Sequence, residues 1–322
     1  MMRDAIVEFA KQFYYAPEVE RPSRKKYQHI IVAGMGGSHL SADVLKGYDP
    51  TLPVSVYHEY GIPYIASEKR KHTLLIASSY SGNTEETIDA FQEAGRQGID
   101  RAALSVGGTL MKLARKEKVS YVQMPDTGIQ PRCALGFSIK ALVALMGLDS
   151  VANDLSRLAK TLKPLASEQK GKALARQLKG MIPLVYASSA NESLAYNWKI
   201  KFNETGKIPA FYNVLPELNH NEMTGFDVQP STEKLSKRFV VLFLRDTQDH
   251  PRIMRRMDII KRLYAQRGLL CENIALNGTT RFQRMFSSLL LADWTAYYTA
   301  TQYGLESEQV PMVEEFKKMI VR

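Results

Sequence analysis

The sequence predicts an α/β protein with two similar domains, each a mainly parallel β-sheet flanked by helices. The length of 322 residues fits two domains, because a single domain typically holds about 150 residues. Short apolar runs alternate with amphipathic segments, which is typical of βαβ units with helices on both faces of a sheet. The order of these elements in the first half returns in the second half, although the two halves share no visible sequence identity.

The first half contains five apolar runs short enough to be strands. One of them, TLLIAS, is apolar almost throughout, as expected for a strand buried on both faces. The expected strands are 29–33, 54–57, 73–78, 102–106 and 119–123, and the expected helices are 38–46, one ending near Arg96, 109–116 and 134–148. The first residues, MMRDAIVEFAKQFYY, read as an amphipathic helix, because two acids interrupt the apolar residues, and not as a signal peptide.

A charged helical stretch over 151–180, broken at Pro164, links the two halves. We therefore expect an N-terminal domain of residues 1–152 and a C-terminal domain of residues 153–322. The C-terminal domain is expected to contain strands at 181–188, 237–244 and 269–276 and helices at 193–203, 253–266 and 282–303. The stretch from Gly206 to Pro230 shows no clear periodicity and is expected to be a long loop, a kind of segment that often carries function.

The composition limits the partners but does not select one. With 43 Lys and Arg against 33 Asp and Glu, the formal net charge is +10, which suits nucleic acid, acidic lipid or phosphorylated metabolites. No zinc-finger spacing, RNP-like aromatic pattern or helix-turn-helix supports nucleic acid, and the longest apolar stretch, 141–148, is too short to span a bilayer. Cys133 and Cys271 lie in no metal or redox spacing, so we expect a reducing cytoplasm.

The first candidate loop is Gly34-Met35-Gly36-Gly37-Ser38-His39, between a strand and a helix. His39 stands where the dinucleotide-binding fingerprint needs glycine, so that fingerprint is not matched. A glycine turn before a helix still lets the backbone approach a ligand, and free N–H groups there favour an anion. Tight packing of the turn is the equally weighted alternative.

The second candidate loop is Ser78-Ser79-Tyr80-Ser81-Gly82-Asn83-Thr84. Its hydroxyls surround one glycine just before a helix, where side chains and backbone N–H groups together can donate to a phosphate. It contains no lysine and no GxxxxGK pattern, so a nucleoside triphosphate with magnesium is not indicated. The alternative is a capped helix start, with Asn83 or Thr84 at the N-cap and Glu86 reaching back. Capping needs one hydroxyl, and this loop has several, so a phosphate monoester is the favoured ligand.

GMGGS, SSYSGNTEET, FNETGK (Phe202–Lys207) and ELNHNE (Glu217–Glu222), in this order, resemble the bifunctional phosphoglucose/phosphomannose isomerases. That family belongs to the phosphoglucose isomerase superfamily and is built from two sugar isomerase (SIS) domains. The resemblance implies two three-layer αβα domains of the flavodoxin-like kind, an N-terminal SIS domain with the phosphate loop and a C-terminal SIS domain with the catalytic residues. It also implies a homodimer, no cofactor, and a place in carbohydrate metabolism, within glycolysis and gluconeogenesis.

The resemblance implies that one loop binds the phosphate and the other lines the sugar. The implied phosphate ligands are Ser79, Ser81 and Thr84, and the implied sugar-lining residues are Gly36, Gly37 and Ser38. The corresponding position of the second half reads SSANESL (188–194) and lacks the SxSGxT pattern, so we expect one phosphate site per chain.

The catalytic roles carried over from the family fall on four side chains. Glu204 matches the general base that moves a proton between carbon 1 and carbon 2, and Arg132 matches the arginine beside the enediolate. His220 matches a ring-opening histidine that reaches the site from the partner subunit. Lys317 best matches the ring-opening lysine, with Lys318 as the alternative one position on.

The residue types suit this chemistry independently. Aldose–ketose interconversion through an enediol needs one carboxylate to take and return a proton, and a fixed cation beside the oxygen that gains charge. Arg132 keeps its proton under all ordinary conditions, so it suits that role. No HxH, HExxH or carboxylate cluster indicates a metal site. Glu204 ends a helix, where an acid opposes the helix dipole, and a residue placed against such a rule is a functional candidate.

One position departs from the family pattern. Where relatives carry threonine or glutamine near the C-terminus, this chain has Val310, which leaves open the preference between glucose and mannose 6-phosphate. The predicted function is an aldose–ketose isomerase of six-carbon sugar 6-phosphates. The alternative is a non-catalytic or regulatory SIS protein that binds a sugar phosphate without converting it.

Overall fold

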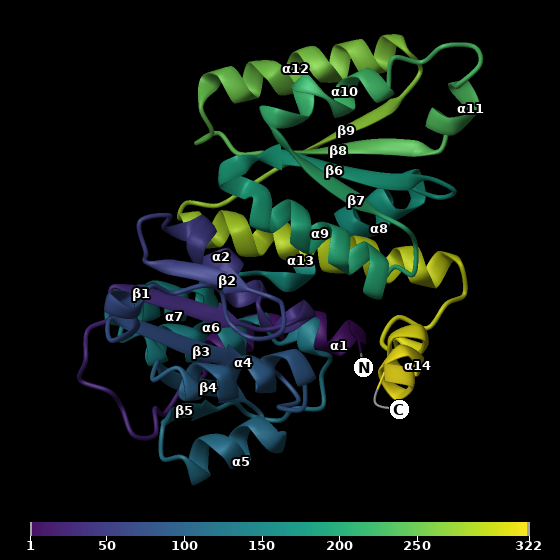
Figure 1. The fold of residues 1–322 in the computed structure, drawn as a ribbon. Coiled ribbons are helices and arrows are strands. Elements are labelled where there is room, and N and C mark those ends of the chain that lie inside the picture. The colour runs from purple at the N-terminus through teal and green to yellow at the C-terminus, as the bar shows by residue number, and fades with distance from the viewer. Residues whose placement is uncertain (1, 321–322) are drawn as a thin grey trace. The chain divides into compact units, whose positions relative to one another are not determined.

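A computed structural model describes residues 2–320 of the chain. They form two compact units, an N-terminal unit of Glu8–Leu162 and a C-terminal unit made of residues 2–7 and 163–320. Each unit has one parallel sheet between layers of helices (Figure 1). The predicted α/β fold class with two mainly parallel sheets is confirmed.

The N-terminal sheet has five strands in the order β2-β1-β3-β4-β5, and every neighbouring pair is parallel. This is the flavodoxin-like strand order, in which ligands bind where the order reverses, beside the first strand. The strands are β1 (His29–Ala33), β2 (Val54–Tyr57), β3 (Thr73–Ser78), β4 (Asp100–Ser105) and β5 (Ser120–Gln123). Each lies within two residues of its predicted position, because the buried strands are short, nearly continuous apolar runs.

Two helical layers cover this sheet. Alternate strand residues, among them Ile31, Leu75 and Ala103, pack with Phe91 and Leu110 of α4 and α5 in one core cluster. The residues between them face the other layer, since side chains alternate along a strand. The helices are α2 (Leu40–Tyr48), α3 (Ser67–Arg70), α4 (Glu85–Arg96), α5 (Gly108–Lys116), α6 (Leu135–Leu145) and α7 (Asp149–Thr161), with 3₁₀ turns η1 (Phe9–Tyr14), η2 (Gly36–Ser38) and η3 (Pro131–Cys133).

The C-terminal sheet has four parallel strands in the order β7-β6-β8-β9. Its strands are β6 (Ile182–Ser188), β7 (Phe211–Leu215), β8 (Phe239–Arg245) and β9 (Leu270–Ala275). Three of the four were predicted, and the edge strand β7 was not. The stretch 206–230, expected to be a loop, also holds η6 (Glu217–His220) and α10 (Glu222–Gly225). β7 is half-buried at a sheet edge and is bounded by Pro209 and Pro216, so it shows no alternation.

Helices on opposite sides of this sheet form its two outer layers (Figure 1). On one side α12 places Met257, Ile260 and Tyr264 against Tyr186 and Phe243 of the sheet. On the other side α9 packs on β6, and α13 packs on α8 and α9. The helices are α1 (Met2–Val7), α8 (Glu168–Gln177), α9 (Glu192–Glu204), α11 (Glu233–Ser236), α12 (Pro251–Gln266), α13 (Arg281–Gln302) and α14 (Pro311–Ile320), with 3₁₀ turns η4 (Pro164–Ser167) and η5 (Ser189–Asn191).

The compact units divide at Leu162 and Lys163, later than the expected boundary between 152 and 153. The reason is that α7 packs on η1 and α6, so the whole helix belongs to the N-terminal unit. The expected N-terminal helix is two elements, α1 and η1, which belong to different units. α1 packs on α13, so residues 2–7 belong to the C-terminal unit.

The last turn of α9 is joined to α13 by a buried ion pair. The Nζ of Lys201 lies 2.5 Å from Oδ1 of Asp293, and the two side chains are 4% and 9% exposed. Removing one charge of such a pair leaves the other buried without compensation, whereas replacing both by apolar groups can be nearly neutral.

The hydroxyl-rich loop after β3 depends on one glycine. Gly82 has φ +71°, and a Cβ at this position would lie 1.9 Å from the carbonyl oxygen of Gly107. Gly98 has nearly the same conformation, φ +69°, but a Cβ there would meet nothing within 4 Å. The two glycines therefore separate the cost of the backbone conformation from the cost of the close approach.

We predict that Gly98→Ala lowers the free energy of unfolding by about 1–2 kcal/mol, the cost of a left-handed alanine. Gly82→Ala should lower it by about 4 kcal/mol, because the loop backbone must also shift. Urea unfolding of both variants measures the difference. Equal destabilisation by the two substitutions would show that the contact with Gly107 does not constrain the loop.

We also predict that Asp293→Leu lowers the free energy of unfolding by about 3–5 kcal/mol, because the ammonium of Lys201 stays buried and unpaired. The double variant Lys201→Met, Asp293→Leu should be clearly more stable than Asp293→Leu alone. A double variant as unstable as the sum of the two single variants would contradict this account of the pair.

Candidate functional site

Two loops of the N-terminal unit meet at the carboxyl edge of its sheet. β1 and β3 are neighbouring parallel strands, so the glycine turn after β1 and the hydroxyl-rich loop after β3 emerge side by side. Tyr80 N donates to Ser38 Oγ over 3.0 Å, and Ser78 Oγ donates to the Ser38 carbonyl oxygen over 2.7 Å. The two predicted ligand-binding loops therefore form one surface, held together by Ser38.

Within the hydroxyl-rich loop the side chains occupy different depths. Ser79 is fully buried, and its Oγ accepts from Gly82 N over 3.1 Å and lies 2.8 Å from Thr84 Oγ1. Ser81 is exposed at the loop tip, where its Oγ accepts from Asn83 N over 3.3 Å. Thr84 is half-buried between these two levels. Ser79 thus supports the loop from below, while Ser81 and Thr84 lie nearer its surface.

The start of α4 carries no side-chain cap. Thr84 stands at the N-cap, yet no side chain accepts from the first N–H groups of the helix, since the Thr84 hydroxyl is directed to Ser79. The Asn83 side chain accepts instead from the backbone N and the hydroxyl of Thr109, each over 3.0 Å. The capped-helix alternative is therefore wrong. These N–H groups belong to a twelve-residue helix and point where an anion would be stabilised.

Arg132 is brought to the same edge by η3. A Cβ on Gly37 would lie 3.0 Å from the backbone N of Arg132, so the glycine turn packs directly against the η3 backbone. The Arg132 side chain is only 3% exposed, and its guanidinium lies 3.5 Å from Gln130 Oε1. A buried guanidinium is a fixed positive charge, because it does not lose its proton. Gly36, the second glycine of the turn, has φ +52°.

Glu204 belongs to the C-terminal unit, where it is the last residue of α9. Because α9 runs back from β6 to the start of β7, it ends at the amino edge of the sheet. The buried ion pair between Lys201 and Asp293 holds the last turn of α9 against α13, three residues before Glu204. Just beyond, the Nζ of Lys207 contacts the carbonyl oxygen of Gln309, which ties the segment before α14 to the same turn.

His220 lies at the opposite edge of the same sheet. It is the exposed last residue of η6, which directly follows β7. Along the strand direction, Glu204 and His220 are therefore separated by the five-residue length of β7, a distance on the order of 17 Å. The structure of one unit does not bring these two predicted catalytic side chains together.

Lys317 and Lys318 are both exposed on α14. The Nζ of Lys317 lies 2.8 Å from Glu314 Oε1 on the preceding turn. Val310 is the residue just before α14, where its carbonyl oxygen accepts from Val313 N over 3.0 Å and Glu314 N over 3.1 Å.

The second sheet fills the position that corresponds to the phosphate loop with its own carboxylates. Asp249 Oδ1 accepts from Ser188 Oγ over 2.6 Å and from Asn191 Nδ2 over 3.0 Å. Arg281 reaches both Asn191 Oδ1, over 2.8 Å, and Asp246 Oδ2, over 2.6 Å. Burial raises the pKa of Asp249 above its usual value. Ser188, Asn191 and Arg281 are thus engaged with partners within the chain, whereas the buried Ser193 Oγ has no hydrogen-bond partner among the described residues.

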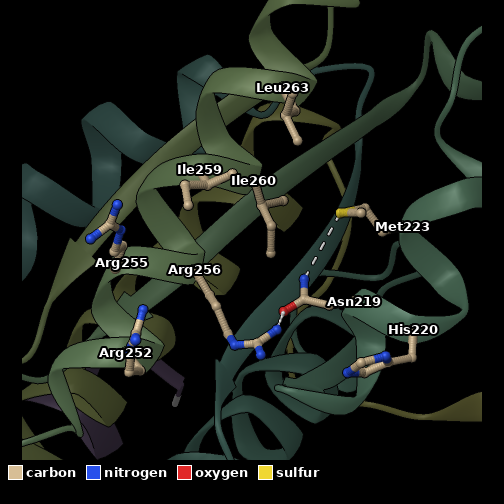
Figure 2. A pocket seen from close by; sticks show the side chains of 9 residues that line it. All are labelled: Asn219, His220, Met223, Arg252, Arg255, Arg256, Ile259, Ile260 and Leu263. Carbon is tan, nitrogen blue, oxygen red and sulfur yellow. Dashed lines mark hydrogen bonds between the residues drawn. The ribbon is translucent and has the colours of Figure 1, made fainter.

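A cavity of about 490 Å³ lies on the α12 side of this sheet, and sequence reasoning did not predict it (Figure 2). Arg256 extends from α12 to donate to Asn219 Oδ1 over 3.0 Å, and His220 lies at the rim. The lining residues are Asn219, His220, Met223, Arg252, Arg255, Arg256, Ile259, Ile260 and Leu263. The basic character of 253–266 in the sequence pointed to one wall of this cavity. The other wall includes η6, which falls in the stretch 206–230 without clear periodicity.

Within residues 2–320 we find no group of three or more His, Cys, Asp and Glu side chains placed to hold a metal ion. Among the helices of that same range, none has the length and apolar character needed to cross a membrane.

Comparison with known proteins gives consistent matches. The family described as "Bacterial phospho-glucose isomerase C-terminal SIS domain" matches residues 167–320. A bifunctional phosphoglucose/phosphomannose isomerase of Caldicellulosiruptor bescii is 35% identical over 308 residues, covering 90% of this chain and 89% of that protein. Its counterpart in Aquifex aeolicus is 33% identical over 298 residues, covering 91% and 90%.

The solved structure of a glucosamine-6-phosphate deaminase from Thermotoga maritima has the same fold, with a TM-score of 0.70, 14% identity and 96% of each chain covered. At that identity the match concerns the fold alone, whereas the sequence matches extend over nearly the whole chain at higher identity. The chain therefore belongs to the family of bifunctional phosphoglucose/phosphomannose isomerases, as its loop motifs suggested.

Proposed function

We propose that this protein interconverts glucose 6-phosphate, and mannose 6-phosphate as a second aldose, with fructose 6-phosphate through an enediol(ate). The observation that carries the proposal is the edge of the first sheet, where the hydroxyl-rich loop, the uncapped start of α4 and a buried arginine lie together. Its relatives in Caldicellulosiruptor bescii and Aquifex aeolicus are named for these two isomerase activities. The proposed place of action is the cytoplasm.

In this proposal the phosphate binds the loop after β3. Ser81 and Thr84 donate their hydroxyls directly, and the first N–H groups of α4 complete the site. Ser79 takes part through Thr84, with which it shares a hydrogen bond of 2.8 Å. The sugar lies along Gly36, Gly37 and Ser38, where the lack of Cβ atoms on the glycines allows close approach.

The proton transfer is assigned to Glu204. Its carboxylate removes the proton from carbon 2 of the open-chain aldose, the enediolate forms as the carbonyl electrons move to oxygen 1, and the same proton returns to carbon 1. The hydroxyl proton passes from oxygen 2 to oxygen 1, which leaves the ketone at carbon 2. Arg132 stabilises the negative charge on the enediolate oxygens, so these side chains need no metal for the reaction.

Ring opening is assigned to His220 and Lys317, with Lys318 as the alternative lysine. One group protonates the ring oxygen while the other removes the proton of the anomeric hydroxyl. Glu204 and His220 lie at opposite edges of one sheet. This separation supports a homodimer in which His220 of the partner subunit serves the Glu204 of the first chain. The N-terminal domain then supplies the phosphate loop, and the C-terminal domain supplies Glu204, His220 and the lysine.

We predict that Glu204→Gln lowers the rate of fructose 6-phosphate conversion by about a thousandfold, because the proton carrier is lost. Glucose 6-phosphate and mannose 6-phosphate are measured separately, with and without EDTA, and EDTA should change neither rate. Glu192→Gln, at the other end of α9, is the matched control and should retain the wild-type rate.

The non-catalytic alternative gives a different result in the same experiment. If wild-type protein forms neither aldose, but binds fructose 6-phosphate in a manner abolished by Ser81→Ala, the chain is a sugar-phosphate-binding protein and the proposed activity is wrong.

We further predict that two inactive variants restore activity when mixed. A Glu204→Gln chain still has His220, and a His220→Ala chain still has Glu204, so a mixed dimer contains one complete site. After unfolding and refolding the two together, about a quarter of the wild-type rate should return, because half of the dimers are mixed and half of their sites are complete. Activity that stays at the level of the separate variants would contradict the sharing of His220.

A further inference from the structure

The last helix of the described chain is amphipathic and unpartnered. Every residue of α14 from Pro311 to Ile320 is exposed. Positions three, four and seven apart on a helix share one face, and here that face is apolar. It consists of Met312, 81% exposed, Val313, 46%, Phe316, 61%, Met319, 67%, and Ile320, 50%. Five large apolar side chains gathered on one open face indicate a surface that another surface covers.

The two edges of this apolar face carry opposite charges. Glu315 lies along one edge and Lys317 along the other, as the helical spacing from Phe316 requires. Glu315 makes no hydrogen bond or ion pair with any residue in the range 2–320, whereas Lys317 pairs with Glu314. A partner surface for α14 should therefore be apolar with positive charge along the edge that meets Glu315.

The cavity beside α12 has this composition (Figure 2). Ile259, 38% exposed, Leu263 and Met223 provide apolar contacts, and three arginines of α12 provide positive charge. The cavity lining contains no carboxylate. Arg252 and Arg255 are exposed, and neither guanidinium pairs with a carboxylate among the described residues. An apolar groove with unpaired arginines along one edge can take the apolar face of an amphipathic helix whose facing edge carries a carboxylate, as Glu315 does on α14.

The chain's own α14 does not reach this cavity. α14 follows α13, which packs on α8 and α9 on one side of the C-terminal sheet, whereas α12 and the cavity lie on the other side. The contact of Lys207 with the Gln309 carbonyl oxygen anchors the segment before α14 at the end of α9. The sheet thus stands between α14 and the cavity of the same chain, so the occupant is a second copy.

We propose that α14 of one chain docks into the α12 cavity of a second copy, with Phe316 and Met319 on Ile259 and Leu263, and Glu315 beside Arg252 and Arg255. In the proposed dimer the exchange is mutual, so both helices and both cavities are used and the two-fold assembly closes. Docking brings Lys317 of one chain to the rim that carries the partner's His220. This last consequence rests on the proposed function, since it explains how the two ring-opening groups meet at one sugar.

A charge-reversal experiment tests the docking without using isomerase activity. Sedimentation velocity at low salt measures the dimer Kd of wild type, Glu315→Arg, Arg252→Glu, Arg255→Glu and the combinations of Glu315→Arg with each arginine variant. Each reversal by itself should raise the Kd by at least about tenfold. At least one combination should lower the dimer Kd again, to no more than about three times the wild-type value. Arg262→Glu, on α12 but outside the cavity, is the matched control and should leave the Kd unchanged.

A cross-link identifies which chains are joined. One chain carries Phe316→Cys and the other Leu263→Cys, and the two are mixed and treated with a short bismaleimide. The native Cys133 and Cys271 are buried, and burial raises the pKa of Cys271 to about 11, so neither competes. A covalent dimer that forms only in the mixture is expected. A monomer under all conditions, a dimer insensitive to the reversals, or a link that forms within one chain carrying both cysteines would overturn the proposal.

Two further outcomes separate the docking from the proposed function. Charge-sensitive dimerisation in a protein without isomerase activity would leave the docking standing and the proposed function wrong. Inorganic phosphate bound by a monomer, and lost in Arg252→Glu and Arg255→Glu, would make the cavity an anion site and overturn the docking alone.

Discussion

The polarity of its parallel sheets is the constraint on which this protein depends. Because all strands of a parallel sheet end at one edge, loops far apart in the sequence meet there, as the turns after β1 and β3 do. The same polarity sends each connecting helix back to the opposite edge. α9 therefore delivers Glu204 to the amino edge of the second sheet, while η6 holds His220 at its carboxyl edge. The polarity of the sheet is therefore the physical reason for proposing that a second chain completes a site that uses both residues.

The hydrogen-bonding groups at the carboxyl edges of the two sheets differ. In the first, backbone N–H groups of α4 and a surface hydroxyl are left for a ligand, and buried Ser79 supports the loop that presents them. In the second, Asp246 accepts from Arg281 and Asp249 accepts from Ser188, two donors that a phosphate could otherwise use. We therefore propose one phosphate site per chain, at the first sheet, because the corresponding edge of the second sheet carries an internal network of ion pairs and hydrogen bonds.

Much of this was predictable because it depends on local patterns. Buried strands such as β3 and β8 are continuous apolar runs, and a loop with several hydroxyls before a helix exceeds what capping requires. Edge strand β7 was not predictable, since a half-buried strand between prolines shows no alternation. The direction of the Thr84 hydroxyl also depends on a contact within the loop, its hydrogen bond to Ser79, which spacing alone does not reveal. The cavity beside α12 combines a regular basic helix with an irregular turn, so only its α12 side had a sequence signal.

The most direct test of the account is a crystal structure with a non-isomerisable six-carbon sugar phosphate bound. The account predicts phosphate oxygens within hydrogen-bond distance of Ser81, Thr84 and the first N–H groups of α4. The Glu204 carboxylate of the same chain should then face carbons 1 and 2, and His220 of the partner subunit should face the ring oxygen. A phosphate bound elsewhere, for example on Arg252 and Arg255, or a sugar approached by neither Glu204 nor a second chain, would contradict it.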